Sequence, residues 1–230
     1  VKVINSKVAN AFVKKNHYSG KVVPNSTLHF GCFLDGNLHG VMSYGSPLDK
    51  RKVLPMVKNT GWNEMLELNR MAFDEFLPKY SESRCIAVSI RLIKKNAPQI
   101  KWILSFADGT QCGDGTIYRA SGFMLTSIKE NTSVIILEDG SIGSRITYQK
   151  GKHILNSKGK AKAPNTSVNM KGKQLRYIYL IDKTCKITVP ILEFSEIDKQ
   201  GAGMYKGKKI TLQERRAINL SAEVDLNAIS

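Results

Sequence analysis

The sequence predicts an α/β protein with a mixed, mostly antiparallel sheet, helices flanking that sheet and a basic C-terminal extension. Three observations support this fold class. Helix-like and strand-like patterns alternate in the first part of the chain, two strand-like runs are joined by a tight turn, and a helical segment connects two further strand-like runs. We expect residues 1–148 to form the core of the fold. Residues 149–230 should form the extension, with strands packed on the core.

The first predicted element is a helix over residues 5–16, because apolar residues recur at helical spacing in VANAFV. The next segment, HYSGKVVPNS, contains glycine and proline and is typical of a loop. A β-hairpin follows in residues 27–34 and 38–45, since the connecting Asp-Gly-Asn accepts the positive φ values of a tight turn.

A strand–helix–strand unit is predicted next. The run LELNRMAF alternates as a strand does, which puts Arg70 on one side and Glu67 on the other. Residues 81–97 carry an apolar stripe at helical spacing, and Ser81 or Ser83 can cap the start of this helix. Because the helix connects LELNRMAF to the strand-like KWILSF, the two strands should be parallel.

Further strand-like segments surround a basic stretch. MLTSIKENTSVIIL predicts two short strands, and YIYLIDKTCKITVPIL returns to strand-like content. Residues 150–176 contain eight Lys or Arg and no Asp or Glu, with too few apolar side chains for a core. We expect this stretch to be a basic arm that lies over a negatively charged partner.

The charge of the chain points to such a partner. Lys and Arg number 35 against 19 Asp and Glu, which gives a formal net charge of +16. Nucleic-acid phosphates are the commonest partner for so large an excess of positive charge. The alternative is a basic protein without an anionic partner.

The cysteine spacing indicates a reducing compartment, and the hydropathy indicates that no segment spans a membrane. The four cysteines form no C-x-x-C pair, which argues against a zinc knuckle and against a dense disulfide framework. No apolar run approaches the ~20 residues that span a bilayer. We therefore expect no membrane partner and a location in the cytoplasm of a bacterial host cell.

The most informative stretch is FADGTQCGDGTIYRASGF. Asp108 comes at the end of the strand-like KWILSFA, where open α/β sheets place ligands. Gly109, Gly113 and Gly115 allow a backbone to approach a substrate closely, and Tyr118 follows on a short helical segment.

The order of elements, ending in a strand, a short helix and Y-x-x-x-G-F, resembles the GCN5-related N-acetyltransferase fold. The fuller set of LELNRMAF, SESR, FADGTQCGDGTIYRASGF and HYSGK resembles the Mom family of phage DNA-modification proteins. This resemblance implies an acyltransferase-like enzyme, encoded by a phage or prophage. Such an enzyme adds a carbamoylmethyl (acetamido) group to N6 of adenine in DNA and protects it from host restriction.

The resemblance also implies roles for five residues that match the family motifs. Asp108 would be a general base or an anchor for the amine. Tyr118 would protonate the departing group, and Arg70 would bind a carbonyl oxygen or a phosphate. His17 would act as a second acid or base, and Tyr18 would help to close the pocket.

Each of these residues also has a structural interpretation. Asp108 can be a turn or capping residue, and Tyr118 can be a core tyrosine. Arg70 can form an ion pair with Glu64 or Asp74. His17 can simply be a favourable contact with the end of the first helix.

The donor stays open. Acetyltransferases of this fold cradle a pyrophosphate with a glycine-rich loop at a helix start, whereas LPKYSESRCIAV has no glycine, which argues against acetyl-CoA. Ser81, Ser83 and Arg84 can still bind an anion at this helix start. An aminoacyl-tRNA or another acyl donor would suit the positive charge, and the spacing of His17 and Asp108 does not require a metal.

Double-stranded DNA is the expected substrate, and tRNA is a second candidate partner as donor. The adenine must leave the duplex to enter a pocket, where Tyr18, Tyr44 or Trp62 can stack on it. Lysines of the basic arm and of KGKK, residues 206–209, would contact phosphates. Two rival functions are an N-acetyltransferase of a small amine or protein and a noncatalytic basic DNA-binding protein.

Overall fold

The structure is a computed structural model that describes residues 1–110, 113–138, 140, 142–145 and 167–202, together with the backbone of residues 204–205 and 208–209. The chain divides into two compact units. The first unit comprises Val1–Ala107, Gly115–Ser127 and Leu175–Glu196, and the second comprises Asp108–Asp114, Ile128–Gln174 and Ile197–Ser230. Most of the predicted extension from residue 149 onward lies outside the described residues, including residues 150–166 of the basic arm and Lys206.

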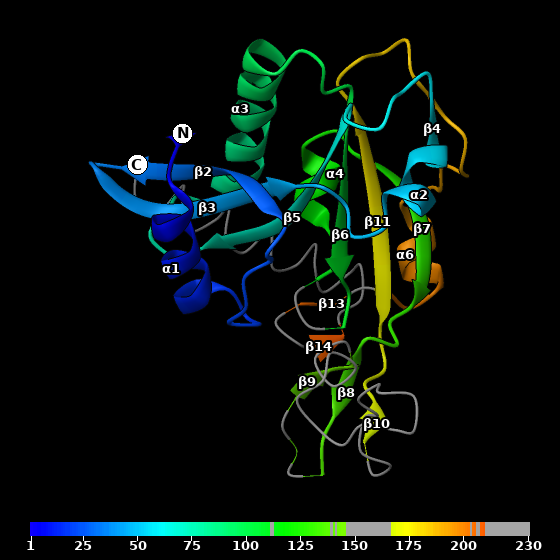
Figure 1. Cartoon of the computed structure of the whole chain (residues 1–230). Coiled ribbons are helices and arrows are strands. Elements are labelled where there is room, and N and C mark those ends of the chain that lie inside the picture. The colour runs from blue at the N-terminus through cyan, green and yellow to red at the C-terminus, as the bar shows by residue number, and fades with distance from the viewer. Residues whose placement is uncertain are drawn as a thin grey trace, which may run out of the picture. The chain divides into compact units, whose positions relative to one another are not determined.

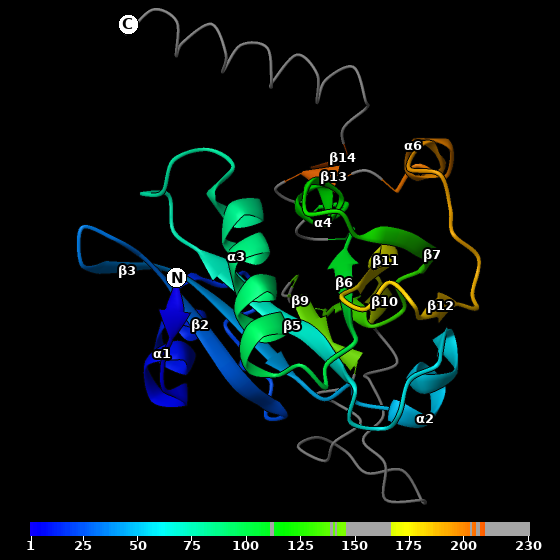
Figure 2. The same ribbon diagram turned by 90° about the horizontal axis from the view of Figure 1, so that it is seen from above.

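The main sheet has seven strands in the order β1-β2-β3-β5-β6-β11-β7. Figure 2 shows β2 and β3 at one side of this sheet and β11 and β7 at the other. The pairs β1–β2, β2–β3 and β3–β5 are antiparallel, and β5–β6 is parallel. The predicted mixed, mostly antiparallel sheet flanked by helices is therefore confirmed. Its strands are β1 (Lys2–Val3), β2 (Ser26–Leu34), β3 (Asn37–Gly45), β5 (Met65–Phe73), β6 (Trp102–Asp108), β7 (Met124–Glu130) and β11 (Lys173–Leu180).

The first helix, α1 (Ser6–Asn16), starts where Asn5 caps it by accepting a hydrogen bond of 2.9 Å from the Val8 amide. Its apolar side packs Ala9 and Val13 against Val41 of β3 and Ala72 of β5. The side of the sheet that carries Val41 and Ala72 is called the α1 face below. In the β2–β3 hairpin, positive φ values occur in the turn, as the Asp-Gly-Asn sequence predicts.

The opposite side, called the α3 face, is covered by α3 (Ser81–Asn96), and Figure 1 shows α3 above and α1 below strands β2 and β3. The Tyr44 hydroxyl lies 2.6 Å from Ser89 Oγ of α3, so Tyr44 points to the α3 face. The helix begins after Tyr80, which has φ 68° and no capping side chain. The predicted cap by Ser81 or Ser83 is wrong, because both hydroxyls donate to preceding carbonyls, those of Pro78 and Tyr80.

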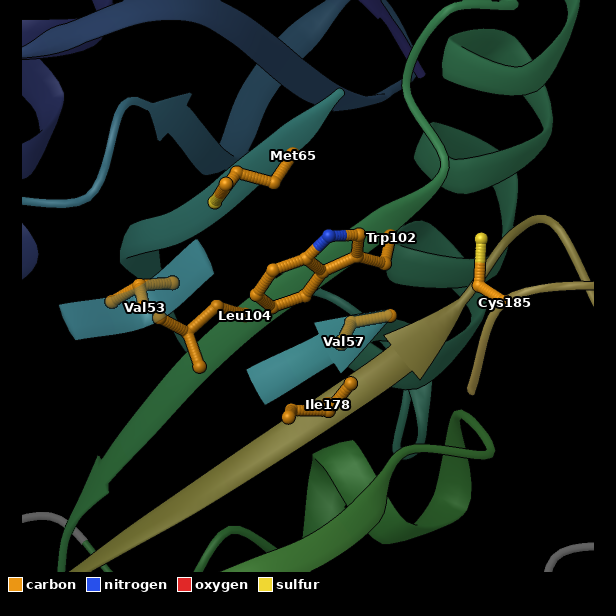
Figure 3. Packing of buried hydrophobic residues seen from close by; sticks show 7 residues of the cluster. All are labelled: Val53, Val57, Met65, Trp102, Leu104, Ile178 and Cys185. Atoms are coloured by element: carbon orange, nitrogen blue, oxygen red, sulfur yellow. The ribbon is translucent and has the colours of Figure 1, made fainter. Parts of the chain in front are cut away.

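Apolar packing covers the middle of the α1 face. Met65, Trp102, Leu104 and Ile178 of the sheet pack against Val53, Val57 and Cys185, as Figure 3 shows. These three residues come from α2 (Lys50–Val53), from β4 (Val57–Lys58), which follows the 3₁₀ turn Leu54–Met56, and from the segment before β12 (Lys186–Ile187). This cluster fixes the N-terminal ends of β5 and β6.

The parallel pair β5–β6 stops before either strand ends. Its ladder runs from Met65 with Trp102 to Leu68 with Ser105, although β5 continues to Phe73 and β6 to Asp108. Ser105 Oγ donates a hydrogen bond of 2.9 Å to the Leu68 carbonyl, so that carbonyl has a partner where the ladder stops. The two strands then diverge, as Figure 1 shows, and this place is called the β5–β6 fork.

The remaining elements are short. They are α4 (Thr116–Ala120), β8 (Val134–Ile136), β9 (Ile142–Ser144), β10 (Val168–Asn169), α6 (Ser195–Lys199), β13 (Met204–Tyr205) and β14 (Lys208–Lys209). The two strands predicted for MLTSIKENTSVIIL are confirmed as β7 and β8. Within the described part of the chain, no helix has the length and hydropathy needed to cross a membrane.

Candidate active site

Arg70 lies in the middle of β5 on the α1 face. Its Nε donates a hydrogen bond of 3.0 Å to the Lys21 carbonyl, and its Nη1 donates one of 3.0 Å to the Asn69 carbonyl. Neither predicted structural partner pairs with it, since Glu64 binds Lys101 at 2.9 Å and Asp74 binds His39 at 3.0 Å.

Among the described residues, no carboxylate lies within ion-pairing distance of Arg70. Backbone carbonyls therefore fix the orientation of the guanidinium without neutralising it. Its remaining N–H groups suit a carbonyl oxygen or an anionic ligand.

His17 lies beside Arg70, at the end of α1. Its Nδ1 accepts a hydrogen bond of 3.1 Å from the Ser19 amide, which places the ring proton of the neutral imidazole on Nε2. Burial and then the positive charge of Arg70 lower the pKa of His17 to about 4. The imidazole is consequently neutral at pH 7 and presents an N–H donor, even though a helix C-terminus favours a cation.

Tyr18 is the exposed aromatic residue of this group. Its ring centroid lies 4.2 Å from that of His17, and 49% of the residue is exposed. Tyr44, by contrast, is fully buried, so the expectation that it stacks on a base is wrong. Trp62 is 49% exposed and has the Lys50 ammonium 5.4 Å from its ring centroid.

Glu67 is a residue of this face that the sequence pattern did not single out. Strict alternation puts Glu67 and Arg70 on opposite sides of β5, but the ladder with β3 is irregular here. Ser43 opposes Arg70 and Tyr44 opposes Leu68, so Asn69 is the extra residue of a β-bulge. Glu67, opposite Gly45, therefore shares the α1 face with Arg70.

The surroundings of Glu67 disfavour its charged form. It follows Met65 on the same face and lies level with Leu104, both members of the apolar cluster. Burial raises the pKa of Glu67 to about 7, against a smaller opposing effect of the Arg70 charge. In the described part of the chain its carboxylate has no hydrogen-bond or ion-pair partner.

The loop between α1 and β2 covers this part of the α1 face. A Cβ at Gly45 would overlap the Asn25 carbonyl oxygen, so the loop backbone passes directly over the residue opposite Glu67. Ser26 Oγ donates 2.8 Å to Asn69 Oδ1. Within the described residues, Asn25 Oδ1 and Asn69 Nδ2 are buried without partners.

Tyr118 occupies the other side of the sheet. It is 7% exposed, and its ring centroid lies 5.3 Å from Tyr177 and 5.5 Å from Phe123. Tyr177 precedes Ile178, which faces the α1 face, so the Tyr118 cluster belongs to the α3 face. Arg70 and Tyr118 can therefore meet one substrate only where the strands separate, at the β5–β6 fork.

Asp108 ends β6 and belongs to the second unit. Its Oδ1 accepts hydrogen bonds of 3.0 Å from the Thr110 amide and 2.8 Å from Asn131 Nδ2. Asn131 Nδ2 also donates 2.9 Å to Thr110 Oγ1. The structure thus brings together His17, Tyr18 and Arg70, whereas Asp108 organises a turn in the second unit.

The predicted anion site at the start of α3 consists of polar groups on one helical turn. The Arg84 side chain is exposed, and Oγ of Ser121, the residue after α4, lies 3.5 Å from the Ser83 carbonyl. The hydroxyls of Ser81 and Ser83 both donate to backbone carbonyls. Binding of an anion by Ser81, Ser83 and Arg84 stays a prediction.

His17 and Glu67 give opposite pH dependences of stability. The pKa of His17 is lowered from 6.5, so its stabilising contribution is present above pH 6.5 and lost as pH falls toward 4. The pKa of Glu67 is raised from 4.5, so its contribution is present below pH 4.5 and lost as pH rises through 7.

We expect E67Q to gain stability over the wild type as pH rises from 4.5 to 7, and H17Q to gain as pH falls from 6.5 to 4. Each change should reach about 2 kcal/mol in the free energy of unfolding, measured by urea titration. Parallel curves for the three proteins would contradict the two pKa shifts.

The profile of the Mom protein family matches residues 1–196. The methylcarbamoylase mom of Escherichia phage Mu is 32% identical over 197 residues, which cover 81% of this chain and 77% of that protein.

Solved structures similar to this chain include N-acetyltransferases. An acetyltransferase of Bacillus subtilis in complex with CoA has 10% identity and a TM-score of 0.45, covering 78% of this chain and 97% of that one. The ribosomal-protein-S18-alanine N-acetyltransferase of Escherichia coli has 10% identity and a TM-score of 0.40, covering 79% of this chain and 92% of that one.

Proposed function

Since the chain belongs to the Mom protein family, we propose that it is a transferase that adds a carbamoylmethyl (acetamido) group to N6 of adenine in phage DNA. This modification would protect the DNA from host restriction in the cytoplasm of the infected cell. The phage Mu relative is itself named a methylcarbamoylase. The observation that carries the proposal is the grouping of the motif residues His17, Tyr18 and Arg70 on one face beside the β5–β6 fork.

The proposed reaction needs groups that these residues can supply. The lone pair of adenine N6 is delocalised into the ring, so the enzyme must position the amine, accept a proton and stabilise charge on the donor. We assign to Arg70 the binding of a donor carbonyl oxygen, because its guanidinium is fixed and has no ion-pair partner in the described residues. His17 Nε2–H is suited to donate a second hydrogen bond to that oxygen.

We propose that the two substrates enter from opposite faces of the sheet. The α1 face carries His17, Tyr18 and Arg70 and would receive the extruded adenine, with Tyr18 stacking on it. The α3 face carries Tyr118, which would give a proton to the departing group of the donor. Asp108, at the end of β6, is proposed as the anchor for the amine.

We propose a donor other than acetyl-CoA, such as an aminoacyl-tRNA or another activated acyl donor. Acetyl-CoA is disfavoured because the start of α3 has no glycine, and its N-cap residue Tyr80 is a bulky residue in the left-handed conformation. Ser81, Ser83 and Arg84 are proposed to bind an anionic part of the donor.

Mass spectrometry of nucleosides tests the proposed function. Plasmid DNA from cells that express the chain should contain a deoxyadenosine with the added mass of one carbamoylmethyl group. Cells that express Asp108→Ala at the same level should lack it. An N-acetyltransferase of small amines or proteins would leave deoxyadenosine unmodified in both strains, and so would a noncatalytic DNA-binding protein.

Binding to double-stranded DNA should depend strongly on salt. With a formal charge of +16, the chain is expected to neutralise several phosphates. The dissociation constant should then rise at least about tenfold between 50 and 200 mM salt in a fluorescence-anisotropy titration. An affinity independent of salt would exclude phosphate contacts as the main source of binding.

A further inference from the structure

We propose that Glu67 is the catalytic base that removes the proton from adenine N6 while the new bond to the donor forms. This step presupposes the DNA modification proposed above and assigns one of its roles to a residue of LELNRMAF for which the resemblance implies no role. The β-bulge at Asn69 turns Glu67 to the same face as Arg70.

The position of Glu67 suits contact with a substrate at the fork. It lies one residue before Leu68, the last residue of β5 that pairs with β6. The loop that contains Asn25 crosses above Gly45, directly opposite Glu67, and the same loop supplies the Lys21 carbonyl that orients Arg70. Glu67 thus lies on the α1 face, which also carries the guanidinium of Arg70 and the imidazole of His17.

The carboxylate of Glu67 is also available for a new hydrogen bond. A half-buried carboxylate is normally paired or hydrogen-bonded, because desolvation without compensation is costly. Within the described residues Glu67 has neither an ion-pair nor a hydrogen-bond partner, and its neighbours Met65 and Leu104 are apolar. An amine at the fork would supply the missing donor.

The other candidate bases are less suited to this step. The imidazole of His17 has its pKa lowered to about 4, which makes it a weak proton acceptor. Asp108 Oδ1 already accepts two hydrogen bonds that hold its turn. The pKa of Glu67, raised to about 7, is close to the pH at which the enzyme would work.

The N6 lone pair forms a bond to the donor carbon, and the bond between that carbon and the leaving group breaks, with its electron pair departing on the leaving group. The proton lost from N6 passes to the Glu67 carboxylate. In this step the donor carries its leaving group on the methylene carbon of the carbamoylmethyl (acetamido) group, and with an aminoacyl donor N6 would attack the carbonyl carbon instead. The proton passes to Glu67 in both cases, and Tyr118 would return a proton to the leaving group.

The charged surroundings of Glu67 allow a pH test. Arg70, on the same strand, is the charged residue that acts on Glu67 among the described residues. The facing positions, Gly45 of β3 and Leu104 of β6, carry no charge, and neither does Val53 of α2, which packs against Leu104. The rate of modification by the wild type should therefore rise with pH through about 7.

The experiment compares the wild type with E67Q, E67D and the control E193Q, an exposed glutamate outside the site. Carbamoylmethyl-deoxyadenosine is quantified over time in cells that produce equal amounts of each protein, and DNA binding and thermal unfolding are measured on the purified chains. E67Q should form the product at least about a hundredfold more slowly, with unchanged DNA affinity and no loss of thermal stability at pH 8. E67D should recover part of the rate, and E193Q should match the wild type.

The outcomes separate the two proposals. Absence of product from the wild type would overturn the proposed function itself, whatever the variants do. Product from E67Q at the rate of the wild type would overturn the role of Glu67 alone. Equal loss of activity in E67Q and E67D, with loss of folded protein in both, would assign Glu67 a structural role and also overturn this inference.

Discussion

Arg70→Lys should lower the rate of adenine modification by at least about a hundredfold. Arg70 uses Nε and Nη1 to bind the carbonyls of Lys21 and Asn69, and its remaining N–H groups stay available to a substrate. A lysine ammonium has a single nitrogen, so it cannot hold two backbone carbonyls and also present a fixed donor pair. The loss should appear mainly in the maximal rate if Arg70 stabilises charge that develops on the donor.

The measurement is product formation by equal amounts of folded protein, with the free energy of unfolding determined in parallel. Two backbone hydrogen bonds are altered, so the variant should lose only about 1–2 kcal/mol of stability. Arg91→Lys is the matched control, because Arg91 is an exposed arginine on α3. A rate within twofold of the wild type for R70K would show that Arg70 has a structural role.

The elements predicted from the sequence depend on local patterns, which explains why they are largely confirmed. The 5–16 helix has an apolar stripe and a cap, and the β2–β3 hairpin has a turn sequence that accepts positive φ. The parallel β5–β6 pair follows from the connecting helix alone. In each case neighbouring residues in the chain determine the structure.

The bulge at Asn69 could not be predicted in this way. LELNRMAF alternates regularly, and the extra residue becomes visible only when Arg70 is paired with Ser43 and Leu68 with Tyr44. Cross-strand register is a tertiary property, and a shift of one residue reverses every side chain beyond it. That is why the sequence pattern separated Glu67 from Arg70.

For the site residues as well, local motifs could be identified from the sequence, whereas contacts between distant segments could not. The motif resemblance implies one site for His17 and Arg70, and in the structure the Arg70 charge contributes to the lowered pKa of His17. It did not predict that His17 would be neutral, because the lowered pKa depends on burial and on the Arg70 charge across the loop. The aromatic packing of Tyr118 against Tyr177 likewise joins segments far apart in the chain.

Gly115→Ala should strongly destabilise the protein, because it adds a methyl group within the aromatic packing on the α3 face. Gly115 precedes α4 with φ 80°, and a Cβ there would lie 2.6 Å from Tyr177 Cε2 and 3.0 Å from Tyr118 Cδ2. Both atoms belong to rings packed in the interior, so neither can move without disturbing the aromatic cluster. We expect a loss of about 3 kcal/mol or more in the free energy of unfolding.

Gly36→Ala is the matched control, since Gly36 has φ 81° and a Cβ there would meet no atom within 4 Å. It should lose only about 1 kcal/mol, the cost of the left-handed conformation alone. The difference between the two variants in urea titrations therefore measures the contact with the aromatic rings.

If Tyr118 acts at the fork, G115A should also lose modification activity in its folded fraction. G36A should keep its activity, because only the substitution at Gly115 displaces the phenol of Tyr118. Equal destabilisation of the two variants would mean that the aromatic cluster yields freely, and a phenol held so loosely could not be positioned to protonate a leaving group.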